Sequence, residues 1–223
     1  MAYILNIETA TKNCSVSISK DGETLLCQEI AETGYSHAEK LHVFIEGLLL
    51  ELQLNYKDLN AIAVSQGPGS YTGLRIGVSA AKGLCYALNI PLIAVDTLAV
   101  LASQLDITDG LIVPMIDARR MEVYSEIFDA QHQKIRATEA EIITEDSFSE
   151  YQENIYFIGD CAEKCKTVLT RPNFLFKEAI VYPSANQMGK ISAEKYKKND
   201  TVDVAYFEPL YLKDFVTTAP KKS

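Results

Sequence analysis

The sequence predicts an α/β protein made of two similar ribonuclease-H-like units, each a mixed sheet covered by helices. Two hydrophobic strands end in an acid, Glu8 and Asp117, and each leads through a turn into a β-hairpin. Strands and helices then alternate after both hairpins, which is typical of a duplicated α/β unit. The polar, turn-prone segment 106–110 separates the halves and predicts lobes at residues 1–106 and 107–223. We expect the last segment of the chain to pack back on the first lobe.

The first half predicts the element order β-β-β-α-β-α-β-α. An Asp-Gly pair at 21–22, between alternating apolar runs, is a strong hairpin signal. Ser36, with Glu39 three residues later, predicts a capped helix start. We expect strands at 3–9, 14–20, 23–30, 61–67 and 91–96, and helices at 36–54, at 72–88 and from Thr97.

The second half repeats the three-strand opening. It predicts strands at 111–117, 121–129, 134–143, 155–159 and 179–182, and helical segments near Glu145, at 162–169 and at 185–197.

Composition limits the function classes. With 21 basic and 30 acidic residues the formal charge is −9, which argues against this chain binding nucleic acid alone. The start lacks the basic residues of a signal peptide, and no apolar run reaches membrane-spanning length. The 5 scattered cysteines predict reduced thiols in a cytoplasmic protein. Cys161 and Cys165 would share a helix face, but the absence of a second pair or a nearby histidine disfavours zinc.

A glycine-rich turn follows the strand at 61–67. A P-loop needs Lys and Ser/Thr directly after its last glycine, whereas Leu74 and Arg75 follow Gly73 here. The glycine spacing also differs from the dinucleotide fingerprint. A helix N-terminus, capped by Ser70 or Thr72, still attracts anions. The candidate ligand or phosphate-facing residues are therefore Glu8, Thr9, Gly67, Gly69, Ser70, Thr72, Arg75 and Asp117; the alternative is a plain strand-to-helix turn.

Helices 36–54 and 72–88 carry more apolar surface than one core face needs. Glycine inside a helix costs about 0.5–1 kcal/mol relative to alanine, so Gly77 and Gly83 suggest close approach of another backbone. Surplus apolar faces on two helices predict a protein–protein interface. Its candidate residues are Leu41, Val43, Phe44, Gly47, Leu50, Leu54, Gly73, Gly77, Ala80, Ala81 and Leu84. The alternative is that both helices are buried within their own chain.

Catalytic and metal-ligating patterns are weak. His37 and His42 are five residues apart and do not share a helix face. Glu8 and Asp117 could hold a metal as paired carboxylates, but no third acid is evident. Arg119 follows Asp117 closely, which favours an ion pair or a turn cap. We predict no catalytic residue and no metal ligand in this chain.

Several stretches together resemble the TsaB (YeaZ) family. They are "ILNIETATKNCSVSI", "HAEKL", "GPGSYTGLRIGVSAAKGLCYALNIPLIAVDTLAVLA", "DARRMEVY" and "PLYLK". The resemblance is specific from residue 3 to about 125 and looser to about 213. Lys213 stands where the family usually has Arg, and Cys161 where it usually has a small residue.

The resemblance implies two actin-like (ASKHA) lobes and an accessory role in tRNA modification. The family acts with the transferase TsaD and the ATPase TsaE to threonylcarbamoylate the adenosine next to the anticodon of ANN-decoding tRNAs. Its N-terminal helices dock on TsaD or on a second copy. We therefore expect ATP and metal only in partner subunits, tRNA contact only through the complex, and a homodimer when the chain is alone.

The same resemblance allows a comparison with the catalytic paralogue TsaD. Asp96, Thr97 and Leu101 stand where TsaD carries its metal-binding segment, and Thr97 and Leu101 cannot supply imidazole ligands. The first-strand turn "ETATKN" also lacks the glycine that lets a phosphate approach the backbone. The remaining alternative is a free-standing ASKHA phosphotransferase that uses Glu8, Asp117 and the 67–73 turn.

Overall fold

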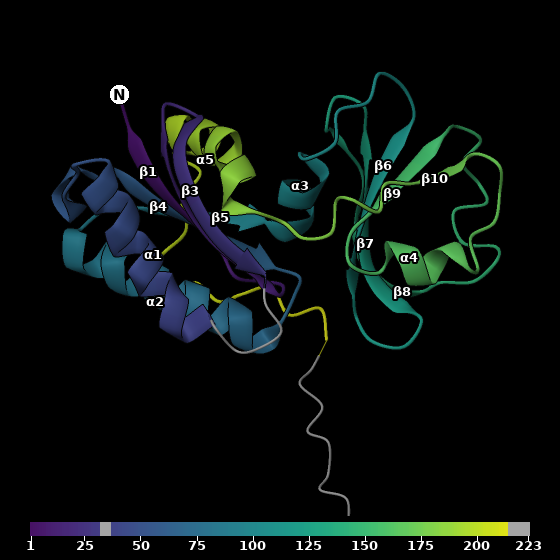
Figure 1. Ribbon diagram of the computed structural model, residues 1–223, viewed down its shortest axis with the longest axis horizontal. Coiled ribbons are helices and arrows are strands. Elements are labelled where there is room, and N and C mark those ends of the chain that lie inside the picture. The colour runs from purple at the N-terminus through teal and green to yellow at the C-terminus, as the bar shows by residue number, and fades with distance from the viewer. Residues whose placement is uncertain (32–36, 214–223) are drawn as a thin grey trace, which may run out of the picture.

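The computed structural model describes residues 1–31 and 37–213. It contains two five-stranded mixed sheets that lie beside one another, each with its own helices (Figure 1). The predicted two-lobed α/β fold is therefore confirmed. The proposed cap residue Ser36 lies outside the described residues.

The first sheet has the strand order β3-β2-β1-β4-β5. Its strands are β1 (Tyr3–Glu8), β2 (Asn13–Lys20), β3 (Glu23–Ala31), β4 (Ala61–Gly67) and β5 (Leu92–Asp96). The first three strands pair antiparallel, and β4 and β5 continue parallel to β1. The hairpin turn at Asp21 and Gly22 has positive φ at both residues, as the Asp-Gly pair predicts.

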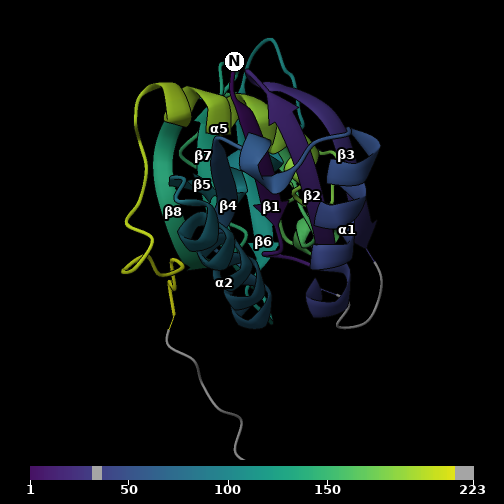
Figure 2. The ribbon, with the colours of Figure 1, turned by 90° about the vertical axis from the view of Figure 1, so that its left-hand side faces the viewer.

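Three helices cover this sheet. Helices α1 (His37–Glu51) and α2 (Tyr71–Leu88) lie side by side on one face (Figure 2). Helix α5 (Met188–Lys197) packs on the opposite face through Met188 and Ala193, although it follows the second sheet in the chain. The two sheet faces thus form separate apolar cores. We call this sheet with α1, α2 and α5 the first lobe.

The return of α5 depends on small polar side chains that the sequence analysis did not single out. The Ser15 hydroxyl accepts a hydrogen bond from the Ala185 backbone N–H at 2.9 Å, and Ser17 donates to the Ala185 carbonyl at 2.7 Å. Ser192 donates to the buried Asn6 side chain at 2.7 Å. Alternate serines on β2 therefore satisfy the polar groups of Ala185, just before α5, and Asn6 on β1 satisfies Ser192 of the helix itself.

The second sheet has the order β10-β9-β6-β7-β8. Its elements are β6 (Leu111–Asp117), β7 (Glu122–Asp129), β8 (Lys134–Ile142), β9 (Ile155–Ile158), β10 (Phe174–Phe176) and the helix α4 (Ala162–Lys166). The predicted strand at 179–182 is wrong, because Phe174 and Phe176 pack on the fully buried Phe157 and β10 takes the edge beside β9. The predicted helix near Glu145 is also wrong, since residues 145–150 form turns. We call this sheet with α4 the second lobe.

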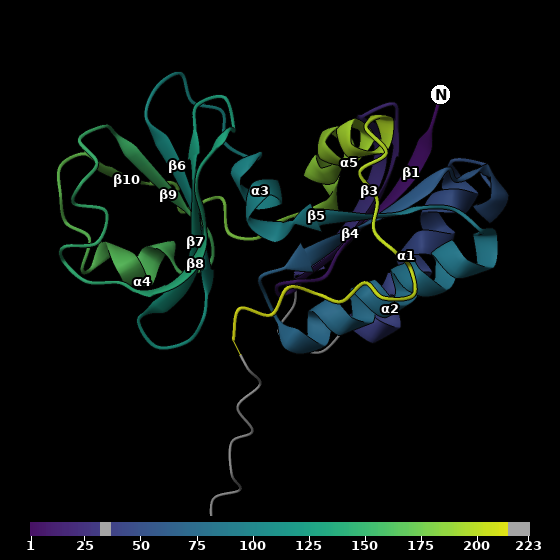
Figure 3. The ribbon, with the colours of Figure 1, turned by 180° about the vertical axis from the view of Figure 1, so that it is seen from behind.

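A short helix joins the two lobes. Helix α3 (Thr97–Ala102) lies between the sheets (Figures 1 and 3). Leu98, Leu101 and Ala102 are fully buried and pack against Ile112 and Ile158 of the second sheet. Within the described ranges, no helix has the length and apolar character needed to cross a bilayer.

Candidate partner-binding surface and ligand turn

The glycine-rich turn packs directly on the turn after β1. The Ser70 backbone N–H donates to the Ala10 carbonyl at 2.6 Å, and the Thr9 hydroxyl donates to the Gly73 carbonyl at 2.8 Å. A Cβ at Gly69 would collide with the Ala10 carbonyl, and one at Gly73 would collide with the Thr9 carbonyl. The two turns are therefore in direct backbone contact with each other.

The start of α2 is capped by Ser70 rather than Thr72. The Ser70 hydroxyl accepts from the Gly73 backbone N–H at 3.2 Å, while Thr72 is exposed. Arg75 is also exposed, and its Nε donates to the Tyr211 hydroxyl at 3.3 Å. Its guanidinium lies 4.1 Å from the ring centroid of Tyr71. Arg75 thus fastens the C-terminal segment to α2.

Glu8 is fully buried at the end of β1. Its Oε1 accepts from the Ala10 backbone N–H at 2.6 Å, whereas Oε2 accepts no hydrogen bond from the described residues. Burial raises the pKa of this carboxyl from 4.5 to about 7, against the smaller opposing effect of the Ala10 N–H. Glu8 therefore holds the β1 turn and does not face a surface site.

Asp117 occupies the corresponding position in the second lobe but is exposed. It accepts from the Arg119 backbone N–H at 3.0 Å and forms an ion pair with Lys164. The turn cap expected from Arg119 is confirmed, whereas the ion pair of Asp117 is formed with Lys164. His37 contacts the Thr11 carbonyl at 2.8 Å through Nε2. Across residues 1–31 and 37–213, no three His, Cys, Asp or Glu side chains are grouped so that they could hold a metal ion.

Several residues predicted to contact a partner lie on the inward side of α1 or α2, where they face the chain's own sheet. A Cβ at Gly77 would meet the Thr9 hydroxyl and lie 3.5 Å from Ile7 Cγ2, so this glycine faces β1. Gly73 faces Thr9, and Ala81 and Leu41 are fully buried in the first core. The prediction that these four residues contact a partner is wrong. Their small or apolar surface lets the chain's own helices approach its own sheet.

The outward side of α1 and α2 retains an apolar surface. Val43 is 60% exposed and Leu50, two turns further along α1, is 81% exposed. On α2, Tyr86 is 85% exposed. The remaining predicted interface residues are only partly covered: Phe44, Gly47, Leu54, Ala80 and Leu84. The sequence analysis missed Tyr86, although its position three residues after Gly83 would place both on one helix face.

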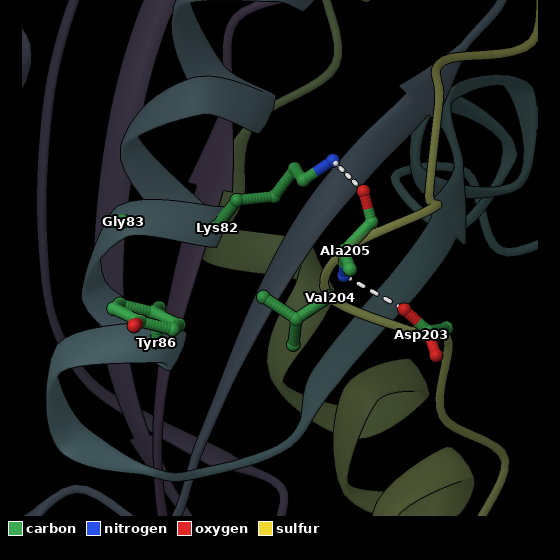
Figure 4. Close-up of a pocket in the computed structure, with 6 residues that line it drawn as sticks. All are labelled: Lys82, Gly83, Tyr86, Asp203, Val204 and Ala205. Atoms are coloured by element: carbon green, nitrogen blue, oxygen red, sulfur yellow. Dashed lines mark hydrogen bonds between the residues drawn. The ribbon is translucent and has the colours of Figure 1, made fainter.

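Gly83 faces open space in the part of the chain that the structure describes. In the described part of the chain, no atom lies within 4 Å of a Cβ placed at Gly83. A helix-interior glycine costs about 1 kcal/mol relative to alanine, and nothing here offsets that cost. Gly83 adjoins an open, mostly apolar depression of about 550 Å³ between α2 and the C-terminal segment (Figure 4). Its lining residues are Lys82, Gly83, Tyr86, Asp203, Val204 and Ala205.

Val43, Leu50, Gly83 and Tyr86 therefore form the exposed apolar part of the outward side of α1 and α2, beside exposed polar residues such as His42 and Glu46. We call it the α1–α2 surface. Its apolar side chains and its helix backbone at Gly83 can receive another helix.

Comparison with known proteins places the chain in a family. The family model described as TsaD, tRNA N6-adenosine threonylcarbamoyltransferase, matches residues 31–221. The tRNA threonylcarbamoyladenosine biosynthesis protein TsaB of Bacillus subtilis is 37% identical over 125 residues, which cover 56% of this chain and 54% of that protein. The protein of the same name from Escherichia coli is 28% identical over 222 residues, covering 96% and 95%.

A solved structure shows the same fold over nearly the whole chain. YeaZ from Pseudomonas aeruginosa superimposes with a TM-score of 0.84 at 24% identity, covering 95% of this chain and 100% of that one. The family model spans most of the chain, and the relatives that match over its full length share one name. The chain therefore belongs to the TsaD family, and within that family to the TsaB (YeaZ) group.

Proposed function

We propose that this chain is a non-catalytic scaffold and activator subunit in the threonylcarbamoylation of tRNA. It acts with a TsaD-like catalytic subunit and a TsaE-like ATPase on the adenosine next to the anticodon of ANN-decoding tRNAs. The observation that carries the proposal is the α1–α2 surface, where Leu50 and Tyr86 are both more than four-fifths exposed. When the chain is alone, a second copy covers the same surface.

A non-catalytic role is supported by the closed ligand turn. The glycine-rich turn packs on the Ala10 carbonyl, and Glu8 is buried at the end of β1. Because the chain has a formal charge of −9, its partners are expected to make most of the contacts with the tRNA phosphates. ATP and any metal are then needed only by the partner subunits, and the complex works in the cytoplasm.

Leu50→Glu is expected to weaken binding to a TsaD-like subunit about 30-fold, the effect of losing one interface hot spot of about 2 kcal/mol. Gly83→Leu is expected to act similarly by blocking approach to the α2 backbone. Calorimetric titration of the full-length subunits measures both dissociation constants. Ile142→Glu is the matched control, because Ile142 is 67% exposed on β8 of the second lobe. Unchanged affinity in both test variants would exclude the α1–α2 surface.

The isolated chain is expected to release no measurable heat with ATP and magnesium, because the glycine-rich turn packs directly on the turn after β1. Isothermal calorimetry at millimolar nucleotide checks this. A dissociation constant in the micromolar range would instead favour the phosphotransferase alternative.

A further inference from the structure

Lys134, at the start of β8, forms ion pairs with carboxylates of both lobes. Its Nζ lies 2.5 Å from Glu126 Oε1 on β7 and 3.0 Å from Asp96 Oδ2 at the end of β5. The Glu126 side chain is fully buried, whereas the side chains of Lys134 and Asp96 are 42% and 31% exposed. One ammonium group thus bridges the second lobe to the first.

The first-lobe end of this bridge is itself fixed. The Gln66 side-chain amide donates to Asp96 Oδ1. The Gln66 carbonyl accepts from the Leu210 backbone N–H at 2.7 Å. On the second-lobe side, the Thr138 hydroxyl donates to Glu126 Oε1 at 3.3 Å. Each carboxylate that contacts Lys134 is therefore held by a further hydrogen bond.

Leu210 belongs to residues 198–213, which we call the C-terminal strap. Figure 3 shows this yellow segment crossing α2 toward the second lobe. Lys82 on α2 donates to the strap carbonyls of Ala205 and Phe207 at 3.0 and 2.9 Å. At the far end of the strap, Lys213 forms an ion pair with Glu122 on β7. The strap thus ties the first lobe to the same strand that carries Glu126.

A buried carboxylate is expensive unless a cation or hydrogen-bond donors compensate it. Such a pair adds little net stability compared with an apolar contact, but it restricts the arrangement to one in which the charges meet. Moving the lobes apart would separate Asp96 from Lys134. It would also expose the apolar side chains through which α3 packs on the second sheet. The ion pair between Lys134 and Asp96 therefore affects the arrangement of the two lobes more than the stability of either lobe.

We propose that Lys134, Asp96 and Glu126 form an interlobe clasp that fixes the angle between the two lobes. The clasp makes the lobes one rigid body, so that the partner-binding helices and the second lobe keep a constant relative position. It does not depend on which partner the chain binds.

Hydrogen exchange of the full chain tests the clasp. Lys134→Met leaves the buried Glu126 without its cation, so the double variant Lys134→Met/Glu126→Gln is measured as well. We expect amide exchange to rise about tenfold in both variants at α3 and in the strap, with β2 and β9 unchanged. Lys134→Arg is expected to restore protection. The control is Lys166→Met, which breaks the exposed Lys166–Glu178 ion pair within the second lobe.

Two results would overturn the proposal. Unchanged exchange at α3 and the strap in the double variant would show that the pairing does not restrain the lobes. An equal rise across both sheets would show that Lys134 stabilises the fold as a whole and has no specific interlobe role.

Discussion

Replacing Gly73 with alanine is expected to lower the free energy of unfolding by about 3 kcal/mol, because the new Cβ would overlap a main-chain carbonyl. That carbonyl belongs to Thr9, whose hydroxyl also donates to the Gly73 carbonyl at 2.8 Å. Neither backbone can move away without breaking the contact between the β1 turn and α2. Urea denaturation at constant pH measures the change.

The matched control is the same substitution in the same helix at Gly83. A Cβ there meets no atom within 4 Å in the described part of the chain, so only helix propensity changes. Gly83→Ala is expected to raise the free energy of unfolding by about 1 kcal/mol. If Gly73→Ala were as stable as the starting protein, the close packing of α2 on the β1 turn would be incorrect.

Glu8→Gln is expected to raise the free energy of unfolding at pH 8.5 by about 3 kcal/mol. The folded chain keeps the Glu8 proton up to a pKa of about 7, whereas the unfolded chain releases it near 4.5. The contribution of the neutral carboxyl to the free energy of unfolding is therefore fully present below pH 4.5. It is lost as the pH rises through 7. Glutamine cannot ionise and retains an acceptor for the Ala10 N–H.

The difference between the two proteins should vanish at pH 4.5 and below. Chemical denaturation at intervals between pH 4 and 9 gives the profile, with exposed Glu145→Gln as the control. A difference that stayed constant across this pH range would contradict a proton-linked role for Glu8.

Local signals in the sequence predicted much of the first lobe. The Asp21–Gly22 hairpin, the Ser70 cap and the strand that ends at Glu8 all depend on neighbouring residues. The strand at Phe174–Phe176 could not be predicted in this way, because it competes with the similarly apolar 179–182 for one sheet edge. Packing on Phe157, a residue distant in sequence, decides which of the two segments pairs with the sheet.

The candidate site was predicted less well for a related reason. Small residues at four-residue spacing show that a backbone comes close to the helix, but not which backbone. Gly73 and Gly77 belong to that row and face their own chain, while Gly83 lies outside the row and faces outward. The bridge from Lys134 to Asp96 was equally hidden, since it joins residues 38 positions apart across two sheets.

We propose that this chain activates a TsaD-like subunit through the α1–α2 surface. The most direct measurement is the yield of threonylcarbamoyladenosine, by mass spectrometry of digested tRNA, in a reaction containing the TsaD-like subunit, the TsaE-like ATPase and this chain. We predict modification with the unaltered chain and with Ile142→Glu, and its loss with Leu50→Glu or when the chain is omitted. Full modification with Leu50→Glu, or without the chain, would contradict the account.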